Sequence, residues 1–114
     1  MLSSSHSLTM DVLSSTVPKL EATGLNWTVF NMRFKDALEA KGYWGHFNGS
    51  LPCPKLDPSP LADETAAHVL WTKNERIAKS LLTQKIPDST LILVHSKVLV
   101  KDCWDAIVAE YTQK

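Results

Sequence analysis

Residues 26–42 read NWTVFNMRFKDALEAKG, and the spacing of their apolar side chains decides the fold. Large apolar residues recur three, four and four positions apart, at Trp27, Phe30, Phe34 and Leu38. This spacing places them on one face of an α-helix, with most of the charged residues on the other face. Asn26 can cap the start of the helix, and Lys41 followed by Gly42 is a typical helix end. The stretch therefore predicts a helix over residues 26–41.

An aromatic turn and a proline-rich loop are predicted to follow this helix. Residues 43–47 read YWGHF and are expected to turn the chain. Four of the six prolines lie within residues 52–60. Because proline removes a backbone donor and restricts φ, this segment is predicted to be an extended loop.

Three more helices are predicted downstream of the loop. Residues 62–85 carry a wide apolar stripe that ends before Pro87, and residues 98–112 repeat apolar side chains at helical spacing. Residues 89–96 are ambiguous, because their LILV run also suits a buried strand. No second strand pattern exists to pair with it, so a short helix is preferred. The predicted fold class is all-α, a small bundle of about four helices.

Length, charge and the N-terminal segment limit the class of protein. The chain has 114 residues, and twelve Lys+Arg balance twelve Asp+Glu, which argues against a strongly basic nucleic-acid-binding domain. No apolar run reaches the roughly 18 residues of a membrane span, so no membrane partner is expected. Residues 1–18 are serine-rich and predict a disordered tail before a single domain over residues 19–112. The N-terminus lacks a secretory-signal pattern, so the expected compartment is the cytoplasm.

The sequence contains no recognisable active site. Candidate ligand pairs, such as His46 with Cys53 and His95 with Cys103, do not match the spacing of known metal sites. No glycine-rich loop with a phosphate-binding pattern is present. The interpretation is therefore a protein without enzyme activity, cofactor or bound metal.

The tryptophans are expected to belong mainly to the hydrophobic core, because each can bury on the order of 200 Å². The alternative is a groove lined by aromatic side chains that binds a ligand or a peptide. The predicted core comprises Trp27, Phe30, Phe34, Leu38, Trp44, Leu70, Trp71, Ala78, Leu81, Trp104, Ile107 and Tyr111.

Four blocks of aromatic and small residues follow one another along the chain. They are LNWTVF at residues 25–30, GYWG at residues 42–45, Trp71 with Glu75 and Ala78, and KDCWDAI at residues 101–107. In this order and spacing they resemble the start of the Gag polyprotein of copia-type retrotransposons, over about residues 19–112. The chain departs from that pattern at Phe30, where the family more often has tryptophan.

The resemblance implies the capsid-like domain of a transposable element, folded like the N-terminal lobe of a retroviral capsid. Such a domain would act by self-assembly with other Gag copies into a particle around the element's RNA. The family's second capsid lobe and zinc knuckle are not among these residues, so RNA contact is expected only through regions downstream of residue 114. The chain would be such a domain or a truncated relic of one. The alternative is a solitary peptide- or partner-binding helical module derived from Gag, whose proline-rich loop could itself be a ligand.

Overall fold

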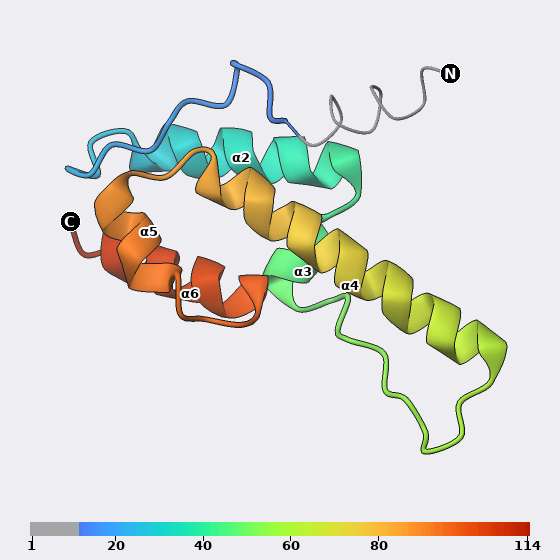
Figure 1. Ribbon diagram of the computed structural model, residues 1–114. Coiled ribbons are helices and arrows are strands. Elements are labelled where there is room, and N and C mark those ends of the chain that lie inside the picture. The colour runs from blue at the N-terminus through green and yellow to red at the C-terminus, as the bar shows by residue number, and fades with distance from the viewer. Residues whose placement is uncertain (1–11) are drawn as a thin grey trace.

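The computed structural model describes residues 12–114, which contain five helices and no strand (Figure 1). With the labels of Figure 1, these are α2 (Trp27–Lys41), α3 (Trp44–Asn48), α4 (Ala62–Thr83), α5 (Asp88–Val94) and α6 (Val100–Tyr111). The predicted all-α fold is confirmed, and the ambiguous LILV run belongs to a helix. The predicted turn at residues 43–47 instead forms most of α3.

Two glycines set the path of the chain around α3. Gly42 and Gly49 both have φ of 84°, in the left-handed region that glycine enters without steric cost. At the end of α2, the amide of Tyr43 donates to the carbonyl of Leu38 at 2.9 Å, as in the usual glycine-terminated helix. The chain therefore reverses at Gly42, and α3 packs back against α2.

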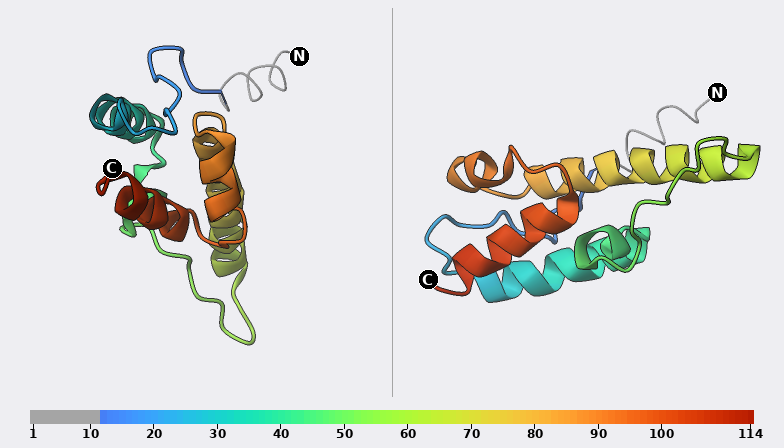
Figure 2. Two further views of the ribbon diagram at one scale, coloured as in Figure 1. Left: turned by 90° about the vertical axis from the view of Figure 1, so that its left-hand side faces the viewer. Right: turned by 90° about the horizontal axis from the view of Figure 1, so that it is seen from below.

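Helix α6 lies between α2 and α4 (Figure 2), and it packs against α3, α4 and α5. Its Trp104 side chain is buried among aromatic rings from the first half of the chain. The Trp104 ring centroid lies 5.2 Å from that of Phe34, 5.4 Å from that of Trp44 and 5.9 Å from that of Phe47. These distances are typical of favourable aromatic pairs. Trp104 thus joins α2, α3 and α6 in one core.

Most of the side chains expected in the core lie there. The buried ones are Phe30, Phe34, Leu38, Ala78, Leu81, Trp104, Ile107 and Tyr111. Trp27 and Trp44 are half-buried and pack against this cluster.

Two expected core residues, both on α4, lie elsewhere. Leu70 is 57% exposed, and Trp71 is half-buried outside the core cluster. The cause is the length of α4, whose N-terminal end extends past the other helices (Figure 1). The apolar stripe continues along the helix to a place where no other helix covers it.

The segment before α2 contributes to the core, so the predicted disordered tail does not extend over residues 12–18. Leu13, Val17 and Leu20 are all at most 4% exposed. The amide of Leu13 donates to Oε1 of Gln84 at 3.2 Å, and the amide of Leu20 donates to the carbonyl of Lys85 at 2.7 Å. These bonds hold the segment against the C-terminal end of α4. The rest of the predicted tail, residues 1–11, lies outside the described residues.

Replacing Trp104 by alanine should lower the free energy of unfolding by about 3–5 kcal/mol, because the side chain fills the centre of the core. Denaturant unfolding measures this loss. Leu70→Ala is the control and should cost less than about 1 kcal/mol, since that side chain is 57% exposed. A loss below about 1 kcal/mol for Trp104→Ala would contradict its central position.

Leu13→Ala should lower the free energy of unfolding by about 2–4 kcal/mol if residues 12–20 pack as described. The matched control is the adjacent Val12→Ala, because Val12 is 57% exposed, and its effect should stay within about 0.5 kcal/mol. Equal effects of the two substitutions would show that this segment does not cover the core.

Candidate functional site

A buried polar cluster joins α3, α4 and α6. Nδ1 of His46 lies 2.8 Å from Oε1 of Glu75, and the backbone amide of Val100 donates to Oε2 of the same carboxylate at 2.7 Å. His46 is 5% exposed and Glu75 is 9% exposed. Both carboxylate oxygens therefore have partners in a site that water scarcely reaches.

Glu75 serves as the cap of a helix to which it does not belong. Leu99 precedes α6 and supplies no capping side chain, so the first amides of that helix need another acceptor. The Glu75 carboxylate fills this role and also places a negative charge at the positive end of the helix dipole. One turn further along α4, Nζ of Lys79 donates to the carbonyl of Lys97 at 2.9 Å. Together these two bonds fix the start of α6 against α4.

The surroundings of His46 are those of a structural residue. The Trp71 ring lies against the imidazole, with centroids 5.2 Å apart, and the Trp71 indole N–H donates to the carbonyl of Leu51 at 2.7 Å. No nucleophilic side chain among the described residues is bonded to this histidine. Nucleophilic catalysis needs a base bonded to an activated serine, cysteine or lysine, and the cluster lacks that partner.

Within residues 12–114, the other two histidines and the two cysteines do not gather around it. His95 is exposed after α5, and His68 is half-buried on α4. Both cysteines are free: Cys53 is exposed in the proline-rich loop, whereas Cys103 is buried in α6, where burial raises the pKa of its thiol. Within residues 12–114, no three His, Cys, Asp or Glu side chains converge as metal ligands.

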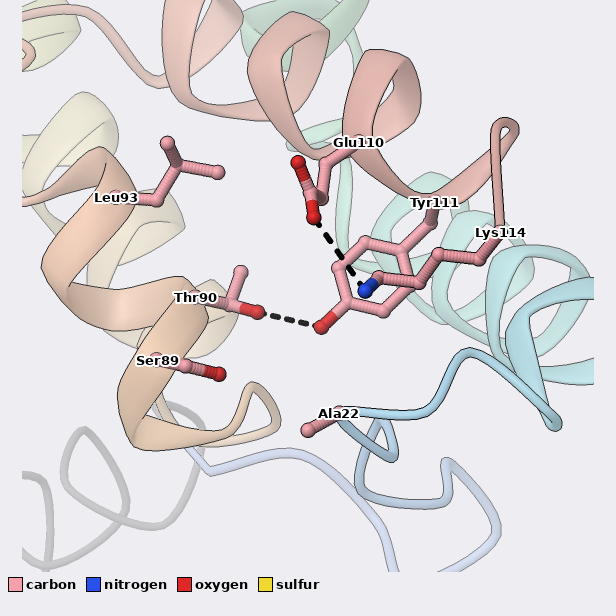
Figure 3. Close-up of a pocket in the computed structure, with 7 residues that line it drawn as sticks. All are labelled: Ala22, Ser89, Thr90, Leu93, Glu110, Tyr111 and Lys114. Carbon is pink, nitrogen blue, oxygen red and sulfur yellow. Dashed lines mark hydrogen bonds and ion pairs between the residues drawn. The ribbon is translucent and has the colours of Figure 1, made fainter.

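A small pocket lies between α5, the end of α6 and the chain near Ala22 (Figure 3). Its volume is about 160 Å³, enough for a few water molecules or a small polar group. Four of its polar side chains bind one another in two pairs, and the exposed Ser89 hydroxyl is separate from them. Thr90 and Tyr111 share a hydrogen bond between their hydroxyls, and the Lys114 ammonium lies 3.4 Å from Oε2 of Glu110. None of these groups is left pointing at a ligand.

Exposed apolar side chains are the features best placed to make external contacts. On the extended end of α4 and the loop before it they are Leu51, Leu56, Leu61, Val69 and Leu70. A second group, Val29 and Met32, lies on the outer side of α2, and a third, with Ile92 and Val98, lies around α5. No helix within the described part of the chain is long and apolar enough to cross a bilayer.

The structure brings together Trp27, Trp44 and Trp104 but leaves Trp71 beside His46. Three surface hollows formed by described residues have no tryptophan in their lining, so these hollows do not form the alternative aromatic groove. The cluster of His46, Glu75 and Val100 was not predicted, because its two bonded pairs join residues that are 29 and 25 positions apart. One signal was available: Glu75 lies four residues after Trp71 and three before Ala78, on the apolar stripe. An acidic residue in such a stripe needs a buried partner.

Comparison of the chain with protein-family models, curated proteins and solved structures found no match.

Glu75→Ala should lower the free energy of unfolding by about 2–4 kcal/mol, because it leaves His46 and the Val100 amide buried without an acceptor. Hydrogen exchange of the Val100 amide should also become faster, since α6 loses its cap. The matched control is Glu110→Ala, which breaks a surface ion pair with Lys114 and should cost less than about 0.5 kcal/mol. Similar losses for both variants would contradict the capping role of Glu75.

Proposed function

We propose that this chain is a structural Gag-type domain of a copia-type retrotransposon, or a relic of one, which acts by self-association into a capsid-like particle. The observation that carries the proposal is the set of four blocks that resemble this family, found in order along the chain. Three of the blocks supply rings to one aromatic core: Phe30 comes from the first, Trp44 from the second and Trp104 from the fourth. A family signature that specifies packing positions in this way suits a structural protein.

The third block, Trp71 with Glu75 and Ala78, does not supply a ring to this aromatic core. Its Trp71 lies outside the core, but Ala78 is buried, and Glu75 holds the start of α6. Each block therefore contributes to holding the helices together. Within the described residues, no block supplies a side chain that is positioned to act as a nucleophile.

Self-association also fits the charge and the surface of the domain. The formal net charge is zero, so copies do not repel one another through their overall charge. Exposed apolar groups lie on three separate parts of the helical domain, and assembly of many copies needs weak contacts repeated by symmetry.

The second candidate is a partner-binding module, and the proline-rich loop is the observation that favours it. All residues from Lys55 to Pro60 are exposed, and three of the loop's four prolines are exposed as well. An extended proline-rich segment suits the aromatic grooves of peptide-binding domains.

Sedimentation velocity from micromolar to millimolar concentrations tests the self-association proposal. We expect a reversible, concentration-dependent rise in the mean sedimentation coefficient, with larger assemblies visible by electron microscopy at the highest concentrations. A chain that remains monomeric at millimolar concentration would overturn the proposal. The partner-binding module would then be the better interpretation.

A further inference from the structure

Helix α4 has two halves with different surroundings. Its C-terminal half is buried in the core at Glu75, Ala78, Leu81 and Leu82. No residue between 62 and 73 is buried, and this half extends beyond the other helices, flanked by the proline-rich loop (Figures 1 and 2). Within this half, Trp71 contacts His46 and Leu51, whereas Val69 and Leu70 are exposed. An apolar surface on such an extension is therefore a candidate for contact with another molecule.

One side of this half has the spacing of a helix–helix interface. Asp63, Ala66, Leu70 and Lys73 follow one another at intervals of three, four and three residues, and all four are exposed. These are the a and d positions of two successive heptads, which form one stripe along a helix. We call these four residues the α4 side stripe. Trp71 contacts His46 and lies about 100° further around the helix, so the stripe is not the side that faces α3.

We propose that the α4 side stripe pairs with the same stripe of a second copy of the chain, antiparallel, about a two-fold axis at the level of His68. In this register Asp63 of each copy lies beside Lys73 of the other. Leu70 of each copy likewise packs against Ala66 of the other, so that a large side chain meets a small one. This inference rests on the proposed function, because it names the surface through which copies associate.

Charge complementarity selects this partner and this direction. Within residues 12–114, neither Asp63 nor Lys73 forms an ion pair, so both charges are available. A parallel pair would place Asp63 beside Asp63 and Lys73 beside Lys73, whereas the antiparallel pair forms two opposite-charge contacts. Antiparallel helices also align their dipoles favourably.

The size of the stripe sets the strength of the contact. An overlap of about eleven residues is roughly 16 Å long and buries on the order of 400 Å² per copy, about half of what a stable interface needs. Leu70, 57% exposed, and the flanking Val69, 60% exposed, supply most of its apolar area. The pair is therefore weak alone and suits a contact that is repeated in a larger assembly.

Sedimentation equilibrium of the full chain and its variants tests this pairing. Leu70→Glu should weaken self-association at least tenfold, because it places two carboxylates in the centre of the contact. The matched control is Leu25→Glu, which introduces the same charge before α2, at a side chain that is 85% exposed and outside the three apolar groups, and should leave association unchanged. Circular dichroism should show that both variants remain folded, since both positions are exposed.

Charge exchange gives a second, independent readout. Asp63→Lys and Lys73→Asp should each weaken association several-fold, and the double variant should restore it to within about twofold of the original. Folding defects would not be repaired in this way, because the two residues belong to different turns of one helix.

The outcomes separate this inference from the proposed function. If the original chain associates and Leu70→Glu associates equally well, or the double charge exchange fails to restore association, the α4 pairing is wrong and another surface is used. If the original chain is monomeric at millimolar concentration, both proposals fail.

Discussion

The packing of Trp104 against aromatic rings of α2 and α3 is the interaction on which the other contacts depend. A tryptophan buries on the order of 200 Å², a large contribution in a chain of 114 residues. Its neighbours Phe34 and Phe47 belong to α2 and α3, so Trp104 joins segments that are far apart along the chain in one core. Helix α5 also packs against α6, and the Tyr111 hydroxyl shares a hydrogen bond with that of Thr90.

Glu75 marks the boundary between the part of α4 that stabilises the domain and the part available for contacts. On the C-terminal side of this residue the helix is buried in the core, and Glu75 itself caps α6. On the N-terminal side, Val69 and Leu70 are exposed. Substitutions at the exposed end can therefore test the proposed association without disturbing the core. This separation makes the proposed role of α4 testable in a small domain, where core changes cost much of the total stability.

Periodicity predicted α2, α4 and α6 well, because the 3.6-residue repeat depends only on neighbours along the chain. It failed for Leu70, since a stripe shows which side of a helix is apolar and not how far the rest of the protein extends along it. It also failed for Leu13 and Val17, because a few apolar residues among serines give no regular pattern. The bond between His46 and Glu75 joins residues 29 positions apart, and local spacing carries no information about such pairs.

The sequence by itself determined the all-α class, the approximate helix ends at Gly42 and Pro87, and the aromatic residues available for a core. These follow from local backbone preferences and from the side on which each helix is apolar. Only the tertiary structure decided that Trp104 is central while Trp71 lies beside His46, and that half of α4 remains uncovered. The physical reason is that burial depends on how whole helices pack together. Trp71 and Trp104 both lie on apolar stripes, and local spacing does not distinguish the one that is buried in the core from the one that is not.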